Sequence, residues 1–442
     1  MAQNALARPQ SVGIIGGGFA GLATGYFLSS RGIRCTVYEK DDRLGGLAAC
    51  FSVHGAPLEK FYHHLFAHDR AMLALVRELG LGQCLLPRET NTGVFYGGKI
   101  WRLSTPLDLL RFSPLSVADR LRLGMLALRA RLVRDFRAIE HLTARDWLVR
   151  MAGPRVYQVV WEPLLRGKFG RFAEEIAAPW FWSKLKLRGG SRSARQAEEL
   201  IYIRGGFARV AQALAERICA AGGEVLLRTP VEKIVVRNGR VAGVVASGAE
   251  RAHDAVVATV APPLVAQLAP DLPAGFASRL RAVRYLGVVC LVLALKRKLS
   301  ETYWLNINEP GFPFVGVIEH TNIIPPEEYG GVHLAYVTKY MLPDDRLFAL
   351  DGRALFEEYL PWLKRIFPDF EERSVCALYC WREKYAQPIV SVGYGELVPP
   401  QRTPIAGLFL CNMAQVYPQD RGTNYSVLFA KQVATMLSKE EQ

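Results

Sequence analysis

Residues 11–39, SVGIIGGGFAGLATGYFLSSRGIRCTVYE, decide the fold. The short apolar run at 12–15 is typical of a buried parallel strand, and the apolar spacing after position 21 indicates a helix. Between them lies a G-x-G-x-x-G pattern at 16–21, and a second strand ends at Glu39. This order and length predict a β-α-β unit that binds a dinucleotide.

Each glycine of this loop has a physical task. Gly16 permits the tight turn after the strand, Gly18 lets a pyrophosphate approach the backbone, and Gly21 lets the helix lie close to the strand. The N–H groups at the start of the helix, at Phe19 and Ala20, stand at the positive end of its dipole. We therefore expect them to hold the phosphates.

The acidic residue Glu39 can accept hydrogen bonds from ribose hydroxyls, which favours an adenosine without a 2′-phosphate. The stretch from Glu39 to position 46 resembles the E-x-x-x-R-x-G-G signature of a large flavoprotein superfamily. That superfamily includes amine oxidases, protoporphyrinogen oxidases, phytoene desaturases and UDP-galactopyranose mutases. The resemblance implies non-covalently bound FAD, although an ordinary glycine turn is the alternative. The contacts it implies in this loop are at Lys40, Arg43, Gly45 and Gly46.

The resemblance extends along the chain and implies an interleaved α/β fold. We expect a Rossmann-like FAD-binding domain made from residues 1–60, 201–265 and 401–442. An α+β substrate domain with an antiparallel sheet and a helical subdomain would occupy residues 61–200 and 266–400.

The later parts of the FAD-binding domain supply further implied contacts. Val231 would contact the adenine through its backbone. Asn412 stands where relatives carry an acidic residue that binds the ribityl chain or the pyrophosphate. The closing helix would point its N-terminus at the flavin, where the helix dipole stabilises negative charge. The implied contacts in front of and within that helix are at Arg421, Gly422 and Asn424.

The composition indicates a globular protein of two interleaved domains. Half of the 442 residues are hydrophobic and 22% are charged, which disfavours disorder. The first ten residues lack the apolar core of a signal peptide, and the longest apolar run, 285–295, is too short to span a bilayer. The eight scattered cysteines show no metal or redox spacing. These features predict a cytoplasmic protein with reduced thiols and without a metal site.

The net charge of +14 is concentrated in the middle of the chain. Arginines alternate with leucines over residues 120–137, which we interpret as one basic helix. Such a helix could rest peripherally on an anionic membrane surface. The alternative is a core helix with a solvated arginine face. No nucleic-acid recognition module is evident.

The stretch 50–66 contains candidate catalytic residues, because relatives bring the chain back to the flavin here. His63 and His64 would alternate between opposite faces of a strand. We therefore expect at most one of them to face the flavin, where it could orient substrate or exchange protons. We favour His64, with Glu59 as second choice; packing or capping is the alternative role.

Three further catalytic candidates lie in the second half of the chain. Glu319 and His320 end an apolar strand, where a charged pair is unusual; a strand-end cap or salt bridge is the alternative. Tyr336 lies on a neighbouring strand. Relatives that oxidise amines often carry a flavin-facing lysine near the positions of Val288 and Val289, and its absence disfavours an amine oxidase.

A basic pair lies in the segment 161–170, which resembles a motif near the substrate cavity of protoporphyrinogen oxidases. Lys168 and Arg166 could hold a carboxylate or phosphate of the substrate. Surface charge around a glycine turn is the alternative.

The leading functional hypothesis is an FAD-dependent oxidoreductase. It would oxidise or desaturate a hydrophobic or lipid-linked small molecule by hydride transfer to the flavin. A second hypothesis is a non-redox isomerase like UDP-galactopyranose mutase, acting on a sugar nucleotide or lipid-linked sugar. A third is a flavin-binding subunit without turnover of its own. Substrate identity, electron acceptor and oligomeric state do not follow from the sequence.

Overall fold

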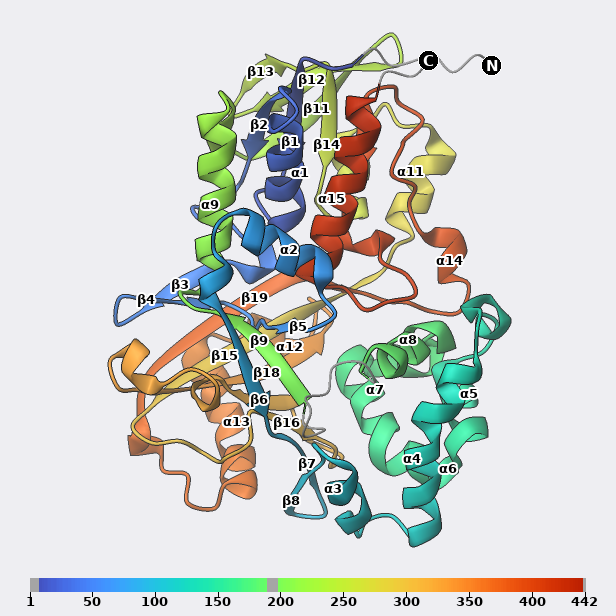
Figure 1. Cartoon of the computed structure of the whole chain (residues 1–442), viewed down its shortest axis with the longest axis vertical. Coiled ribbons are helices and arrows are strands. Elements are labelled where there is room, and N and C mark those ends of the chain that lie inside the picture. The colour runs from blue at the N-terminus through green and yellow to red at the C-terminus, as the bar shows by residue number, and fades with distance from the viewer. Residues whose placement is uncertain (1–7, 189–197, 440–442) are drawn as a thin grey trace.

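A computed structural model describes residues 8–188 and 198–439. The segment 1–10, expected to lack a leader, therefore lies largely outside the described residues. The upper part of the molecule is built on a five-stranded parallel sheet, which confirms the expected α/β fold class (Figure 1). Its strands, in spatial order, are β10 (Glu224–Leu226), β2 (Arg34–Tyr38), β1 (Ser11–Ile15), β14 (Ala255–Ala258) and β20 (Leu408–Leu410).

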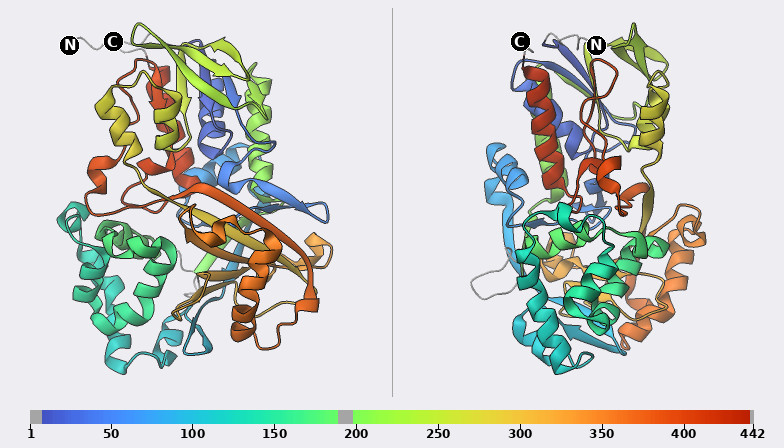
Figure 2. Two further views of the ribbon diagram at one scale, coloured as in Figure 1. Left: turned by 180° about the vertical axis from the view of Figure 1, so that it is seen from behind. Right: turned by 90° about the vertical axis from the view of Figure 1, so that its right-hand side faces the viewer.

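Both faces of this sheet are covered, as the continuous apolar strands require. One face carries the helices α1 (Phe19–Ser29), α9 (Gly206–Ala220) and α15 (Thr423–Ser438), which stand side by side in Figure 1. The other face carries an antiparallel sheet and two short helices (Figure 2). These elements are β11 (Val231–Arg237), β12 (Arg240–Ala246), β13 (Ala249–Ala252), α10 (Pro262–Leu268) and α11 (Ala274–Arg281).

The glycine-rich loop allows α1 to lie directly against the end of β1. Gly16 adopts a φ of 109°, which favours glycine. A Cβ atom at position 21 would lie 1.9 Å from the carbonyl oxygen of Gly16. Any side chain at position 21 would therefore force the helix away from the strand.

The lower part of the molecule contains a seven-stranded mixed sheet. The apolar run 285–295 is its strand β15, and ten of its eleven residues are buried. The helix α13 (Gly352–Ile366) packs on one face of this sheet. The strands, in spatial order, are β19 (Val375–Pro388), β15 (Tyr285–Leu295), β18 (His333–Met341), β17 (Gly316–Glu319), β16 (Trp304–Ile307), β7 (Thr92–Tyr96) and β8 (Lys99–Arg102).

Smaller elements join the two parts. The hairpin of β3 (Cys50–Val53) and β4 (Ala56–Glu59) leaves the upper sheet. A second small sheet has the order β5 (Leu65–Phe66), β9 (Glu198–Ile203) and β6 (Leu85–Thr90), and α2 (Arg70–Glu78) packs against α15.

A helical subdomain lies beside the seven-stranded sheet (Figure 1). The expected basic helix over 120–137 is wrong at both ends, because α4 spans Val117–Leu132. Ser116 caps its start, and Asp135 accepts a hydrogen bond from the N–H of Arg137 to begin a separate short turn. The other helices are α3 (Pro106–Arg111), α5 (Ala144–Ala152), α6 (Pro154–Val156), α7 (Glu162–Phe169) and α8 (Ala178–Arg188).

Within residues 8–188 and 198–439, none of the helices combines the length and apolar character needed to cross a bilayer.

We expect Gly21→Ala to lower the free energy of unfolding by about 1–3 kcal/mol, because the added methyl group overlaps the Gly16 carbonyl. Gly124→Ala is the matched control. A Cβ there would make an ordinary 3.7 Å contact on α4, and the change should stabilise the helix by about 0.5–1 kcal/mol. Urea unfolding of both variants checks this; equal effects would contradict the proposed close contact.

Candidate functional site

The N-terminus of α1 forms the first part of the site. The N-cap residue, Gly18, has no side chain that could accept hydrogen bonds from the first N–H groups, and the first turn holds no acidic residue. Gly45 pairs with Gly18, and the Gly45 N–H donates to the Gly17 carbonyl at 2.9 Å. A Cβ at Gly46 would lie 3.1 Å from the Gly18 Cα. Two glycine loops thus pack closely around an uncapped helix end, an arrangement that fits a pyrophosphate.

Glu39 lies buried at the carboxyl end of β2, beside the glycine loop. Its carboxylate accepts hydrogen bonds from the N–H of Gly17 at 2.6 Å and of Asp41 at 2.9 Å. Burial raises the pKa of Glu39, while these two hydrogen bonds oppose that shift. The carboxylate is therefore held rigidly beside the glycine loop.

The other expected cofactor residues differ in their surroundings. Lys40 is exposed, and Val231 is half-buried at the start of β11. The half-exposed Arg43 donates to the Cys50 carbonyl oxygen at 2.8 Å. Arg43 therefore ties its own loop to β3.

The C-terminal segment from Asn412 onward contributes a hydrogen-bond donor and a second helix N-terminus without a side-chain cap. The Oδ1 atom of Asn412 accepts from the Ala414 N–H, whereas its Nδ2 is buried with no partner among the described residues. That amide is a donor that a bound cofactor could satisfy. The cap of α15, Gly422, makes no side-chain cap and lines a cavity. Asn424 instead accepts from two N–H groups in the first turn of α2.

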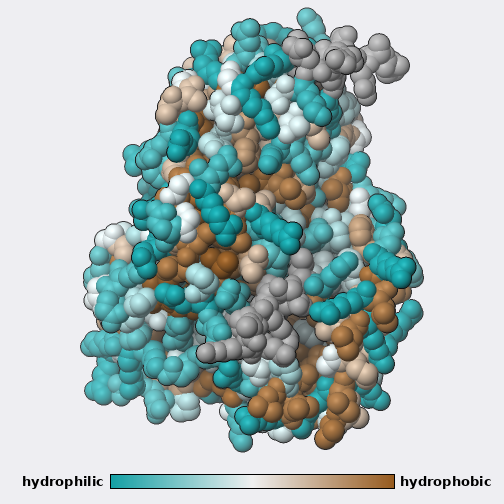
Figure 3. All heavy atoms as spheres, in the orientation of Figure 1, coloured by the Kyte–Doolittle hydropathy of each residue, from teal (hydrophilic) through white to brown (hydrophobic). Residues whose placement is uncertain are grey.

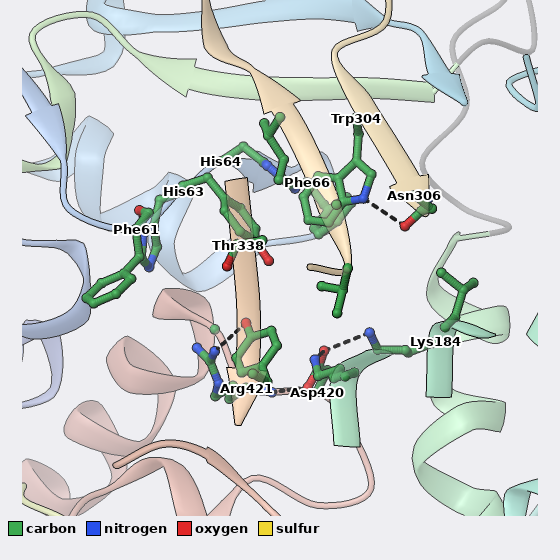
Figure 4. A pocket seen from close by; sticks show the side chains of 18 of the residues that line it. Phe61, His63, His64, Phe66, Lys184, Trp304, Asn306, Thr338, Asp420 and Arg421 are labelled. Atoms are coloured by element: carbon green, nitrogen blue, oxygen red, sulfur yellow. Dashed lines mark hydrogen bonds and ion pairs between the residues drawn. The ribbon is translucent and has the colours of Figure 1, made fainter. Parts of the chain in front are cut away.

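This cavity, of about 380 Å³, lies where the two parts of the chain and the helical subdomain meet. Its walls come from the segment 61–69, helices α7 and α8, the seven-stranded sheet and residues 420–425. Figure 4 shows His64, Phe66 and Trp304 on one side and Lys184, Asp420 and Arg421 on the other.

Aromatic rings dominate the side that contains the histidines. The His64 Nδ1 lies 3.2 Å from the Tyr303 hydroxyl, and its ring lies 5.6 Å from that of Trp304. The Tyr62 ring packs edge-on against Trp304 with centroids 4.8 Å apart. The His63 Nδ1 lies 2.6 Å from the Phe61 carbonyl, and burial lowers the pKa of His63 to about 4.

The expected alternation of His63 and His64 is wrong, because β4 ends at Glu59 and residues 60–64 are not in a strand. Both histidines line the cavity. Glu59 does not; it is fully buried and accepts hydrogen bonds from the Tyr202 hydroxyl and the Phe207 N–H, each at 2.8 Å.

A cationic cluster forms the opposite side. Lys168 of α7 and Lys184 of α8 place their Nζ atoms 2.6 and 2.8 Å from the same Asp420 carboxylate oxygen. The Trp180 Nε1 donates to the other oxygen at 3.2 Å. Next to it, the Arg421 guanidinium donates to the Tyr340 hydroxyl at 3.0 Å.

This cluster carries an excess of positive charge, with three cations and one carboxylate. Burial lowers the pKa of Lys168, although Asp420 opposes that shift. Burial alone would raise the pKa of Asp420, but the charges of Lys168, Lys184 and Arg421 hold it below its ordinary value. Lys184 also lies 4.6 Å from the Trp180 ring centroid, a cation–π contact.

Two expected catalytic residues make structural contacts outside the cavity wall. Glu319 accepts hydrogen bonds from the loop 299–300, at 2.8 Å from the Leu299 N–H and 2.6 Å from the Ser300 hydroxyl. His320 is buried, with its Nε2 2.8 Å from the Tyr329 hydroxyl. Strand alternation explains the position of Glu319, because Gly316 and Ile318 on the same strand face the cavity. His320 follows the end of β17 and begins a short turn over residues 320–322.

Tyr336 and Arg166 also lie away from the cavity wall. The fully buried Tyr336 donates its hydroxyl to the Glu59 carbonyl oxygen at 2.8 Å. Arg166 is half-exposed and pairs with Glu162 and Glu174. Of the basic pair expected in this segment, Lys168 alone lines the cavity.

Sequence reasoning missed Lys184, Trp180 and Asp420. Lys184 and Trp180 are four residues apart, a spacing that puts them on one face of a helix. Asp420 directly precedes the expected contact Arg421. Their convergence is a tertiary contact between segments more than 230 residues apart, and no local pattern signals it.

Val288 and Val289, near which relatives that oxidise amines often carry a lysine, lie in different surroundings. Val288 lines the cavity, whereas Val289 packs into the core beneath α13. The cavity wall at this strand is therefore apolar.

The sequence model of the family described as flavin containing amine oxidoreductase matches residues 19–419. Among curated proteins, coproporphyrinogen III oxidase of Propionibacterium freudenreichii subsp. freudenreichii is 22% identical over 289 residues, 51% of this chain and 53% of the relative. The chain thus spans about half the length of that relative.

Two solved structures show a similar fold over nearly the whole chain. One, from Exiguobacterium sp. 255-15 and provisionally named protoporphyrinogen oxidase, is 18% identical with a TM-score of 0.77, covering 96% of this chain and 98% of that one. Cyclohexylamine oxidase from Brevibacterium oxydans IH-35A is 16% identical with a TM-score of 0.71, covering 97% and 99%. At these identities the likeness shows the fold.

We expect His320→Gln to change the pH dependence of stability. Burial lowers the pKa of His320 from 6.5 to about 3, so the unfolded state alone takes up a proton as the pH falls through 6.5. The stability advantage of the parent protein over the variant should be constant above that pH. It should shrink by about 1–2 kcal/mol at a pH of about 5. Urea unfolding across this range checks it; parallel curves would contradict a buried neutral imidazole.

Proposed function

This chain belongs to the family of flavin-containing amine oxidoreductases, and we propose that it oxidises a hydrophobic small molecule that carries an anionic group. The observation that carries the proposal is the cavity with aromatic rings on one side and the Lys168–Lys184–Arg421 cluster on the other. The membership makes it an FAD-dependent oxidoreductase; the substrate class is our inference.

The electrostatics of the cavity favour an anion over an amine. The cavity wall holds three cations and two carboxylates, Asp420 and Asp69, so it keeps an excess of positive charge in a partly buried place. A protonated amine would be repelled there, whereas a carboxylate or phosphate would gain charge-assisted hydrogen bonds. Val288 is a second argument against an amine substrate. This apolar residue of the cavity wall lies near the position where relatives that oxidise amines often carry a lysine.

The residues of the chain fit FAD at the adjoining glycine loops. Gly18 and Gly45 leave room for the pyrophosphate, Glu39 would hold the ribose, and the Asn412 amide would donate to the cofactor. When bound, FAD supplies the acceptor for a hydride from the substrate. The uncapped N-terminus of α15 would stabilise negative charge at its end.

The remaining steps belong to the cavity walls. Aromatic residues such as Tyr62 and Trp304 would exclude water and position the apolar body of the substrate. Lys168 and Lys184 would orient its anionic end by exchanging part of their interaction with Asp420. We assign the imidazole of His64 to orienting the substrate and exchanging a proton with it.

An isomerase acting on a sugar nucleotide or a lipid-linked sugar is a second candidate. The observation in its favour is again the lysine pair, because two converging ammonium groups suit a diphosphate. Such an enzyme needs reduced flavin but produces no net electron transfer.

Anaerobic spectroscopy of the purified holoprotein separates these functions. We expect hydrophobic compounds with an acidic group, porphyrinogens among them, to bleach the visible absorbance of oxidised flavin, and amines to leave it unchanged. Bleaching by amines alone would overturn the substrate class. Conversion of a sugar nucleotide or lipid-linked sugar after dithionite reduction, without bleaching, would establish the isomerase. A flavin that responds to none of these would indicate a subunit without turnover.

Replacing the lysines tests the anion site with a pair of probes that differ in charge, a fatty acid and the alkylamine of equal chain length. We expect Lys168→Met and Lys184→Met each to weaken fatty-acid binding by about tenfold or more, because a charge-assisted hydrogen bond is lost. Binding is read from the perturbation of the flavin spectrum. Alkylamine binding should be unchanged or tighter.

The exposed Lys186, two residues after Lys184 on α8, provides the matched control. Lys186→Met should bind both probes as the parent protein does. Equal weakening in all three variants, or unaltered fatty-acid binding in the two cavity variants, would contradict the anion site.

A further inference from the structure

The exposed apolar side chains of the described residues are concentrated in one region. Eleven large apolar side chains are well exposed, and eight of them lie between positions 100 and 132. Five of the eight belong to α4, with exposed fractions from 41% at Met125 to 80% at Leu132. Such a concentration on a folded domain marks an interaction surface.

The exposed residues of α4 form a single stripe. They recur every three or four positions along the whole helix, so they share one face. The other side of α4 buries Leu126 and Ala130 in the helical subdomain. Two exposed leucines of α3, which packs on α4, extend the stripe. We call this surface the α3–α4 ridge; it consists of Leu107, Leu110, Val117, Leu121, Met125, Leu128 and Leu132.

Apolar side chains gather over α3 and α4 at the lower right of the molecule in Figure 3, with hydrophilic residues around them. The helical spacing of the residues and the surface view therefore identify the same apolar stripe.

Positive charge surrounds the α3–α4 ridge. Residues 99–137 contain nine basic and three acidic residues. The acidic residues are engaged. Asp108 and Asp119 lie in the first turns of α3 and α4, where they accept hydrogen bonds from the cap residues and pair with arginines, and Asp135 begins the next turn. The exposed arginines here are Arg102, Arg111, Arg122, Arg129, Arg131, Arg134 and Arg137.

We propose that the α3–α4 ridge docks the protein on an anionic lipid bilayer. The leucines would enter the boundary between headgroups and acyl chains, while the arginines contact lipid phosphates and keep their charged ends in the interface. This proposal does not depend on the reaction catalysed.

The charge argues for lipid over a second copy of the chain. Symmetric pairing through the ridge would bring two strongly positive surfaces together, and their repulsion would oppose it. The stripe is also aliphatic, whereas the cores of protein interfaces are enriched in aromatic residues.

Docking here would bring the cavity close to the bilayer. Helix α4 packs against α8, and α8 supplies Phe181 and Lys184 to the cavity wall. A hydrophobic compound leaving the bilayer would therefore meet the same helical layer that encloses the cavity.

Cosedimentation of the holoprotein with vesicles tests the proposal. We expect binding to phosphatidylcholine vesicles that contain phosphatidylglycerol, little binding to phosphatidylcholine alone, and release by added salt. Leu121→Ser with Leu128→Ser should reduce the partition coefficient by about tenfold or more, because two apolar side chains no longer insert. Arg129→Gln with Arg134→Gln should lower the salt-sensitive part of binding.

Leu227→Ser is the matched control, since Leu227 is 40% exposed on the upper part of the molecule; it should bind as the parent protein does. Unfolding midpoints and flavin spectra establish that the variants are folded. Failure of the parent protein to bind, or equal binding by the leucine variant, would overturn the proposal. So would a dimer that the leucine substitutions dissociate.

Discussion

The contact between the backbone at Gly16 and Gly21 is the constraint on which the proposed cofactor site depends. It brings the start of α1 to the end of β1, where the helix can direct its uncapped N–H groups outward. The same lack of side chains allows the Gly45–Gly46 loop to lie against Gly18. Glu39 then bonds to the loop from the neighbouring strand. The site that we propose for the dinucleotide is therefore built largely from main chain, and its geometry follows from the sheet.

Asp420 has a comparable role for the cavity, but through charge. One carboxylate holds two lysines from two helices and so connects the helical subdomain to the segment that precedes α15. Partly buried charges cost free energy unless they are balanced, and this cluster is not balanced. An anionic ligand would supply the missing charge, which gives a physical reason for a positive wall in an otherwise aromatic cavity.

Patterns confined to neighbouring residues could be predicted from the sequence. The glycine fingerprint and the β-α-β unit around it form as expected, because spacing and backbone preference suffice to specify them. Contacts between distant segments could not be predicted. Nothing local to Glu319 indicates that it holds the loop 299–300, and nothing near Lys184 points to Asp420.

Helix α4 shows why composition alone left its role open between a core helix and a surface helix. Leucines occur on both of its faces, so its apolar content is high but does not select one side. Packing decides the matter: Leu126 and Ala130 enter the core, and the remaining apolar residues stay outside among the arginines. The buried face accounts for the stability of the helix in the subdomain. The exposed stripe is not needed to fill the core and is therefore free to serve an interaction.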